Sequence, residues 1–303
     1  MNIDFTNLKV LLIGDFMVDH YIIGKSNRLS PEAPVPVIIP HKNFSVPGGA
    51  GNVAMNLSIL GAKVTCIGVI GDDLWGKKII SMLKKENINT NQLKKIDKHI
   101  TTLKQRIYIG DKQVLRIDTE KKIQLTDYPK IKNKDYDVVI LSDYNKGVLD
   151  TLWFDLNSLN NVFVDPKKKS FEHYKNAKII TPNLNELSIA CGKDLKNDSD
   201  IINECKKLIR KYNFEYIIAK KGKNGMTIIG KNNFVKHIEA HNVVKPDVTG
   251  AGDTVIASLS LCYAHTGDLE FSARFANAAA SVAVGKSGTS YAKLSEIKNI
   301  FFK

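Results

Sequence analysis

The chain has 303 residues, of which 43% are hydrophobic, and its 44 lysines and arginines outnumber its 31 aspartates and glutamates to give a formal charge of +13. This length and apolar content can bury one large core, so we expect a single α/β domain over residues 1–303. No apolar stretch of about 18 residues and no secretory leader is visible, so we expect a cytoplasmic protein with no membrane partner.

The positive charge is nearly all lysine and is spread along the chain, since arginine occurs only at positions 28, 106, 116, 210 and 274. Dedicated nucleic-acid binders more often cluster arginine and lysine with aromatic residues on one element, so we expect no nucleic-acid partner. The cysteines form no Cys-x-x-Cys pair, which argues against a zinc site or redox motif. We expect four reduced, buried thiols: Cys66, Cys191, Cys205 and Cys262.

The first apolar run, residues 9–15, ends in Gly-Asp and predicts a buried parallel strand. Ligands of open α/β sheets gather at the carboxyl ends of such strands. Asp15 and Asp19 could therefore both offer oxygens to a polyol, although Asp15 could instead only cap the turn. The prolines within residues 28–40 exclude a helix and predict a protruding, extended flap.

A glycine-rich turn at residues 48–51 precedes an apolar pattern of helical period. Gly48 and Gly49 let the backbone approach a ligand closely, and Asn52 offers both a donor and an acceptor to sugar hydroxyls. The turn lacks the Gly-x-Gly-x-x-Gly spacing and a Gly-Lys-Ser/Thr sequence. It therefore argues against a Rossmann dehydrogenase and a P-loop enzyme.

Residues 101–109 and 113–118 alternate polar and apolar side chains around a turn at residues 110–112, which predicts a β-hairpin. Together with the flap, it predicts a small β lid over the main sheet, with strands from about 20–47 and 100–118. Basic side chains alternate along the hairpin and could grip a substrate phosphate, or could simply be solvated. They are Lys104, Arg106 and Arg116.

From residue 137 on, short apolar runs that end in polar clusters predict further strands, and later residues 216–229 predict two strands around a turn. The shared strand edge predicts a site made of Asp143, Lys146, Asp165, Lys167 and Asn183. Of these, Asp143, Lys146 and Lys167 would contact the substrate. Asn183 and Glu186 would lie on one side of a helix's first turn. They could hold a water-coated Mg²⁺, form a capping box, or do both.

Residues 246–254 combine a glycine-rich turn with a carboxylate at the start of the first of three expected helices, at about 252–266, 268–286 and 293–302. Backbone amides at the positive end of that helix would bind phosphate, namely those of Gly250, Ala251 and Gly252. Asp253 would repel a phosphate, and a role as the base for an attacking hydroxyl explains its presence. Alternatively Asp247 or Thr249 caps the helix and Asp253 complements its dipole.

Three motifs, Gly-Gly-Ala-Gly-Asn52, Asn183-x-x-Glu186 and Asp-Val-Thr-Gly-Ala-Gly-Asp253, resemble in order and spacing those of the ribokinase-like (PfkB) carbohydrate kinases. Further segments, among them Arg-x-Ser-Pro-Glu-Ala-Pro-Val-Pro-Val37 and Leu-Ser-Asp-Tyr-x-Lys-Gly147, look like those of members that phosphorylate D-glycero-β-D-manno-heptose 7-phosphate at O1. The resemblance covers almost the whole chain. It implies a three-layer α/β/α domain with a mostly parallel sheet and a small β lid.

By position, the resemblance implies that Asp253 is the base and that the amides of Gly250, Ala251 and Gly252 form the anion hole. It implies sugar contacts from Asp15, Gly48, Gly49 and Asn52, and Mg²⁺ ordered through water by Asn183 and Glu186. On the nucleotide side it implies six residues: Asn183, Lys220, Gly222, Gly225, Thr249 and Asn277. A monovalent cation such as K⁺ would lie near Asp247, Thr249 and Gly288.

Two departures from the family pattern stand out. Gly51 replaces an alanine that is common in related sequences, which should only loosen the turn. Residues 219–222 read Ala-Lys-Lys-Gly, where a hydroxyl-bearing run such as Thr-Arg-Ser is expected. This second change questions the polar contacts to the nucleotide.

The resemblance implies ATP and a sugar phosphate as substrates, Mg²⁺ as a cofactor, and a homodimer formed through the β flaps. It places the reaction in ADP-heptose synthesis for the lipopolysaccharide inner core, with a separate adenylyltransferase and a phosphatase. The alternatives are a kinase of a ribose- or fructose-type sugar, and a non-catalytic sensor that has kept the fold.

Overall fold

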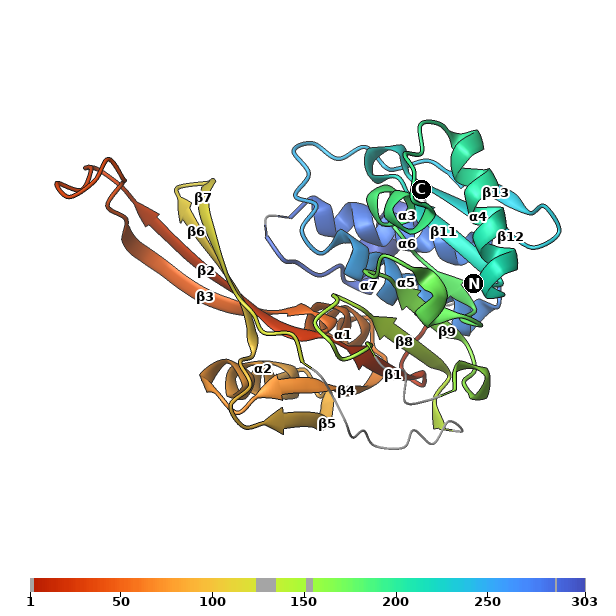
Figure 1. Cartoon of the computed structure of the whole chain (residues 1–303), viewed down its shortest axis with the longest axis horizontal. Helices are drawn as coiled ribbons and strands as arrows, with labels where there is room; N and C mark the ends of the chain where they lie inside the picture. The colour runs from red at the N-terminus through yellow and green to blue at the C-terminus, as the bar shows by residue number, and fades with distance from the viewer. Residues whose placement is uncertain (1–2, 124–134, 151–154, 287, 303) are drawn as a thin grey trace.

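The structure, a computed structural model, describes residues 3–123, 135–150, 155–286 and 288–302. Within them, nine strands form one sheet in the order β13-β12-β11-β10-β9-β8-β1-β4-β5, and four strands form a second in the order β3-β2-β6-β7. Figure 1 shows the smaller sheet, which we call the lid, projecting from one side of the helix-covered sheet. The predicted three-layer α/β fold with a smaller second sheet is confirmed.

The large sheet is parallel except at one edge, where β12 pairs antiparallel with both β11 and β13. Its central strands are apolar on both faces because helices cover both. The strands are β1 (Lys9–Gly14), β4 (Lys63–Gly71), β5 (Asn89–Ile96), β8 (Val138–Ser142), β9 (Val162–Asp165), β10 (Ile179–Ile180), β11 (Tyr216–Lys220), β12 (Met226–Gly230) and β13 (Val235–Ile238).

Two hydrophobic cores lie on opposite faces of this sheet. In β1, Val10 and Leu12 belong to one core and Leu11 and Ile13 to the other, as the alternation of side chains along a strand requires. The first core is covered by α1 (Ala50–Ile59), α2 (Leu74–Lys85), α5 (Ala251–Thr266), α6 (Leu269–Val284) and α7 (Leu294–Phe301). The second is covered by α3 (Leu184–Cys191) and α4 (Asp198–Tyr212).

The helices near the end of the chain begin and end within two residues of the predicted bounds. Helix α4 was not predicted. Its buried residues Ile201, Cys205, Leu208 and Ile209 recur at helical spacing, so its amphipathic pattern was available in the sequence.

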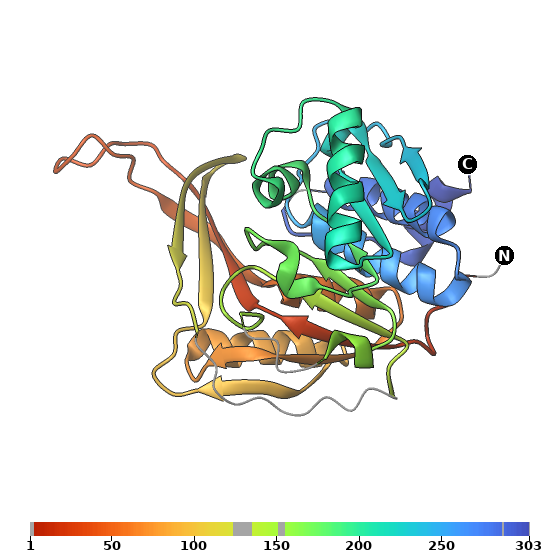
Figure 2. The same cartoon turned by 45° about the vertical axis from the view of Figure 1, so that its right-hand side comes forward.

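The lid consists of β2 (Phe16–Lys25), β3 (Ile39–Gly49), β6 (Thr102–Ile109) and β7 (Lys112–Thr119). Strand β2 pairs antiparallel with β3 and parallel with β6, and β6 and β7 form the predicted hairpin. No helix is assigned to the proline-rich residues 28–38, which join β2 to β3. Both views show this segment at the end of a ribbon that extends away from the rest of the molecule (Figures 1 and 2).

Asp15 is the single residue between β1 of the large sheet and β2 of the lid. Its buried carboxylate accepts hydrogen bonds from the amides of Tyr144, Lys146 and Val148 at 2.8, 3.0 and 3.2 Å. Burial and the neighbouring Asp143 raise the pKa of Asp15 to about 6, although these amide bonds oppose the rise. Both oxygens of Asp15 thus accept hydrogen bonds from backbone amides, as the turn-capping alternative predicts. A contact between Asp15 and a sugar stays a prediction.

Among the described residues, no helix is both long enough and apolar enough to cross a bilayer. The four cysteines carry free thiols, and Cys66, Cys205 and Cys262 are buried as predicted. Cys191, at the end of α3, is only half-buried, so the expectation of burial is wrong for this thiol.

Candidate active site

The glycine-rich turn before α5 brings that helix against α1. Gly250, the residue before the helix, has φ +77°, and a methyl group there would lie 2.5 Å from the side-chain nitrogen of Asn52. Only glycine fits both constraints. The amide of Ala251 donates to the carbonyl of Val248 at 3.2 Å, so this predicted member of the anion hole is already engaged. The amides of Gly252 and Asp253, in the first turn, have no acceptor within the helix.

Asp253 lies in this first turn and is almost fully buried, with 4% of the residue exposed. Asn52 donates from Nδ2 to its Oδ2 at 2.7 Å, and the Tyr144 hydroxyl donates to its Oδ1 at 2.6 Å. The two donors come from α1 and from the loop after β8. The carboxylate is therefore fixed in position by segments remote in the sequence.

Burial raises the pKa of Asp253 to about 7, and the nearby Asp165 acts in the same direction. The hydrogen bonds from Tyr144 and Asn52 and the charge of Lys220 oppose the rise. A carboxylate that titrates near neutral pH is suited to accept a proton from a hydroxyl group.

Lys220, at the end of β11, carries a buried ammonium group beside the start of α5. It pairs with Asp165 at 2.5 Å, and a methyl group on Gly252 would lie 3.2 Å from its Nζ. Burial lowers the pKa of Lys220, but the attraction of Asp165 more than offsets this and the pKa lies above its ordinary value. A fixed positive charge thus stands where a hydroxyl-bearing run was expected.

A cavity of about 430 Å³ lies beside the same helix end. It contains five of the six residues predicted for nucleotide binding: Asn183, Lys220, Gly222, Gly225 and Asn277. Met226, Val243 and Val255 supply apolar walls, and the volume is in the range of small-ligand sites. Thr249 is not among the described lining residues, and its amide donates to the Asp247 carboxylate at 3.0 Å.

The capping-box alternative for Asn183 and Glu186 is present in the structure. The Glu186 amide donates to Asn183 Oδ1 at 2.9 Å, and the Asn183 amide donates to Glu186 Oε2 at 2.8 Å. Lys167 donates to Glu186 Oε1 at 2.8 Å. Each carboxylate oxygen keeps a free lone pair, so the pair fits a Mg²⁺ held through water. Among the described residues no three His, Cys, Asp or Glu side chains cluster as a direct metal cage.

Lys167 and Asp143 were predicted to face the substrate, and their contacts point elsewhere. Lys167 pairs with Glu186, which is a predicted Mg²⁺ residue, and so lies apart from Lys104, Arg106 and Arg116 of the lid. Asp143 is buried, and its oxygens accept hydrogen bonds from the Tyr174 hydroxyl and the Asn145 amide. Asp143 therefore stabilises the loop after β8. Lys146 pairs with Glu120 at 2.6 Å.

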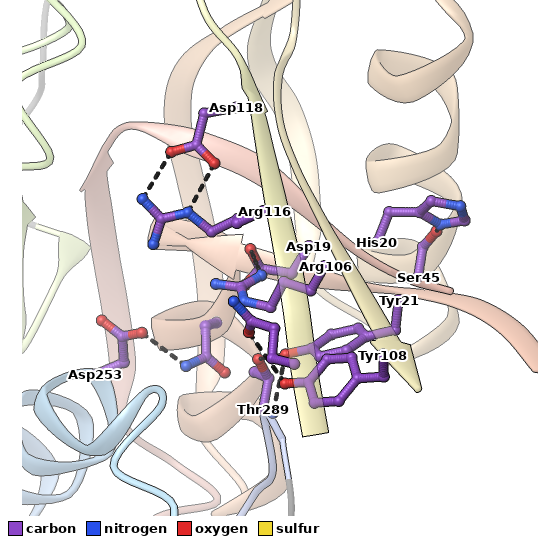
Figure 3. Close-up of polar contacts among 12 residues, drawn as sticks. Asp19, His20, Tyr21, Ser45, Arg106, Tyr108, Arg116, Asp118, Asp253 and Thr289 are labelled. Carbon is purple, nitrogen blue, oxygen red and sulfur yellow. Dashed lines mark hydrogen bonds and ion pairs between the residues drawn. The ribbon is translucent and has the colours of Figure 1, made fainter. Parts of the chain in front are cut away.

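Arg106 and Arg116 lie on one face of the lid, together with carboxylates and tyrosines (Figure 3). The strand register places Lys104, two residues before Arg106 on β6, on the same face. Arg106 donates to Asp19 at 2.6 Å and lies over the ring of Tyr21. Arg116 pairs with Asp118 at 2.9 Å. Figure 3 shows these side chains on the side of the lid where Asp253 lies, and His20 and Ser45 on the other.

Lys104 lies on the same strand as Arg106, and its ammonium is 5.7 Å from the ring centroid of Tyr144. Burial lowers its pKa. Gly48 lies beside Asp19, since a methyl group there would be 2.7 Å from a carboxylate oxygen, and Gly49 directly precedes α1. Glycine at position 48 thus leaves the Asp19 carboxylate room at the base of the lid.

Gly51 does not loosen the turn, contrary to the expectation. It lies inside the first turn of α1, and a methyl group there would lie 2.9 Å from the Cβ of Pro47. The absence of a side chain at this position lets α1 pack against the end of β3.

Asp247 joins two loops that were predicted to hold a monovalent cation. Its carboxylate accepts from the amides of Thr249 and Gly288, the latter at 2.7 Å. Although burial opposes it, these hydrogen bonds hold the pKa of Asp247 below its ordinary value. The lid reaches the same place, where the Tyr21 hydroxyl lies 3.0 Å from Thr289 Oγ1.

Tyr144 was not predicted as a site residue, although the motif that contains it was recognised. It follows Asp143 directly after β8, at the sheet edge where polar side chains gather. Its aromatic ring gave no sign in the sequence that its hydroxyl would reach Asp253.

The family profile described as pfkB family carbohydrate kinase matches residues 7–296. The chain belongs to this family. Its ribokinase-like fold is also shared with the Arabidopsis thaliana ribokinase complexed with ribose and ATP, at a TM-score of 0.77 and 19% identity over 97% of this chain and 98% of that one. The Escherichia coli phosphofructokinase-2 in complex with potassium matches at a TM-score of 0.76 and 18% identity over 98% and 99% of the two chains.

Among curated proteins, the chain is 42% identical over 306 residues to the bifunctional protein HldE of Helicobacter acinonychis (strain Sheeba). This match covers 95% of this chain and 65% of that protein. The protein of the same name from Campylobacter fetus subsp. fetus (strain 82-40) is 37% identical over 97% of this chain and 66% of its own length. The chain thus spans about two thirds of the length of these relatives.

Replacing Asp253 by asparagine should stabilise the protein in a pH-dependent way. The pKa of about 7 in the folded state lies above the ordinary unfolded value of about 3.9, so the folded state binds more protons between these pH values. The contribution of Asp253 to stability therefore falls as pH rises through this range. We expect the melting temperature of Asp253→Asn, relative to wild type, to rise by a few degrees from pH 5 to pH 8.

The two proteins share every other titrating group, so the difference between their melting curves isolates Asp253. A difference in melting temperature that is constant from pH 5 to pH 8 would show that the carboxylate is not buried as described.

Proposed function

We propose that this pfkB-family chain uses ATP to phosphorylate D-glycero-β-D-manno-heptose 7-phosphate at O1, which gives the 1,7-bisphosphate. The observation that carries the proposal is the position of Asp253. This buried carboxylate lies at the start of α5, beside a cavity large enough for a nucleotide base and on the side of the lid that carries its arginines. The similarity to the HldE proteins supports the choice of sugar.

In the reaction, Asp253 would take the proton of the sugar O1 hydroxyl as O1 attacks the γ-phosphorus of ATP. The bond from that phosphorus to the β,γ-bridging oxygen breaks, and ADP leaves. The amides of the first turn of α5 and the ammonium of Lys220 would stabilise negative charge on the transferring group. Mg²⁺, ordered by water on Asn183 and Glu186, would neutralise charge on the phosphates of ATP.

The lid would hold the substrate at its other end. Arg106, Arg116 and Lys104 lie on one face by the strand register and would supply donors for a phosphate remote from the reacting carbon. Asp19 and Asn52 would bind sugar hydroxyls near the base. Arg106 and Arg116 already pair with carboxylates, so the substrate phosphate would compete with Asp19 and Asp118 for them.

Further parts of the proposal concern assembly, ions and pathway. The lid exposes Val114, Leu115 and Ile117 on β7, which supports a homodimer formed through the lids. The loops joined by Asp247 would bind K⁺, and the fold is shared with a phosphofructokinase-2 that was solved in complex with potassium. A phosphatase and an adenylyltransferase would convert the bisphosphate to ADP-heptose. The use of ATP agrees with action in the cytoplasm.

Asp253→Asn should lower turnover by about 10²–10⁴-fold, because the variant keeps the shape of the helix start but loses the base. ATP affinity should stay the same or rise, because a negative charge near the phosphates is removed. The measurements are kcat for ADP formation and the nucleotide dissociation constant. Near-normal turnover in a folded variant would falsify the base assignment and leave Asp253 as a helix cap.

Arg106→Ala should raise KM for the sugar phosphate by about 10–100-fold, since a charge-assisted hydrogen bond is lost and Asp19 is left without its partner. KM for ATP should change little. Arg210→Ala, an exposed change on α4, is the control for losing an arginine. Equal changes in both KM values, or none, would remove Arg106 from the substrate site.

A further inference from the structure

Tyr144 places a buried phenol against the carboxylate proposed as the base. Its hydroxyl donates to Asp253 Oδ1 at 2.6 Å, a short distance of the kind found for hydroxyl donors to carboxylates. Burial, and then the negative charge of Asp253, raise the pKa of Tyr144 well above its ordinary value. The phenol therefore keeps its proton and acts as a donor throughout the pH range in which Asp253 titrates.

The backbone at Tyr144 is held by its own set of hydrogen bonds. Asp15 accepts from its amide at 2.8 Å and from the Lys146 amide at 3.0 Å, and Asp143 accepts from the Asn145 amide at 2.6 Å. Gly147 has φ +114°, and a methyl group there would collide with the carbonyl of Ile123. The loop therefore presents the phenol at one place, and that place is fixed by the residue that joins the two sheets.

Tyr144 also lies between the base and the lid. One face of its ring receives the ammonium of Lys104 from β6, at 5.7 Å, an attractive arrangement for a cation and an aromatic ring. Its hydroxyl is directed to Asp253 on α5. A phenylalanine would fill the same space and keep the contact with Lys104, so only the bond to Asp253 depends on the hydroxyl.

We propose that Tyr144 is a positioning residue for the phosphoryl transfer: its hydroxyl orients Asp253 and favours its ionised form, so that the base is ready at neutral pH. This inference rests on the proposed function, in which Asp253 accepts the substrate proton. Asn52 holds the other oxygen from α1 at 2.7 Å. With Oδ2 held by Asn52 and Oδ1 by Tyr144, the carboxylate has one orientation toward the substrate.

Several other charged or titrating groups lie near this carboxylate, and their charges also affect the pKa values of Asp253 and its neighbours. Asp165 on β9 opposes ionisation of Asp253, and Lys220 on β11 favours it. The negative charge of Asp253 also raises the pKa of Tyr291, which lies before α7. The negative charge of Asp19 on the lid raises the pKa of Tyr144. Tyr144→Phe changes none of these groups, so it isolates the hydroxyl.

The test is the pH profile of kcat/KM for Tyr144→Phe. In the wild-type enzyme the rate should rise with pH through an acid limb near pH 7, the pKa of Asp253. Loss of one charge-assisted hydrogen bond should move this limb upward by about one pH unit. The variant should therefore lose about tenfold more activity at pH 6 than at pH 9.

Tyr174→Phe is the matched control, because it removes a buried phenol that donates to another carboxylate, that of Asp143, at 2.7 Å. Its acid limb should stay at the wild-type position. Should Tyr144→Phe fail to fold, 3-fluorotyrosine placed at position 144 gives a stronger donor and should move the limb downward.

The outcomes separate the two proposals. If Asp253→Asn keeps its turnover, the assignment of Asp253 as the base in the proposed function fails, and the role of Tyr144 fails with it. If Asp253→Asn is inactive while the acid limb of Tyr144→Phe, or of the fluorinated protein, stays in place, only the role of Tyr144 is overturned. A loss of activity that is equal at every pH overturns it as well, because it would mark Tyr144 as structural.

Discussion

The proposed active site depends on the burial of one carboxylate, Asp253, beside the positive end of a helix. Burial favours the protonated form of Asp253 and raises its pKa. The hydrogen bonds from Tyr144 and Asn52 and the charge of Lys220 favour the ionised form, and the resulting pKa is about 7. Each of these three groups is placed by a particular feature of the fold. Gly250 leaves room for Asn52, the loop after β8 carries Tyr144, and Lys220 is held by Asp165.

The two sheets are joined at the same place. Asp15 separates β1 from β2, and its carboxylate fixes the loop that carries Tyr144. A shift of the lid relative to the large sheet would therefore reach Asp253 through Tyr144, which both Asp15 and Lys104 contact. The site of a sugar kinase must exclude water while phosphate transfers, and a lid anchored at the base suits that need.

Local patterns predicted much of this structure. Apolar runs ended by polar residues indicated β1, β8 and β9, and the glycine-rich turn at residues 246–254 indicated the start of α5. The bond from Tyr144 to Asp253 spans 109 residues, and the role of Asp15 depends on amides 129 to 133 residues away. Such contacts follow from packing of distant segments and leave no periodic pattern, so Asp253 could be proposed as the base from the sequence, but the groups that contact its carboxylate could not be predicted.

We propose that the product of this site is a sugar phosphate newly phosphorylated at its anomeric oxygen. ADP release should be measured with heptose 7-phosphate, free heptose, ribose and fructose 6-phosphate, followed by ³¹P NMR of the product. We expect fastest release of ADP with heptose 7-phosphate and a second phosphorus signal from a phosphate on O1. Faster release with free ribose or with fructose 6-phosphate, or a product that keeps its reducing end, would contradict it.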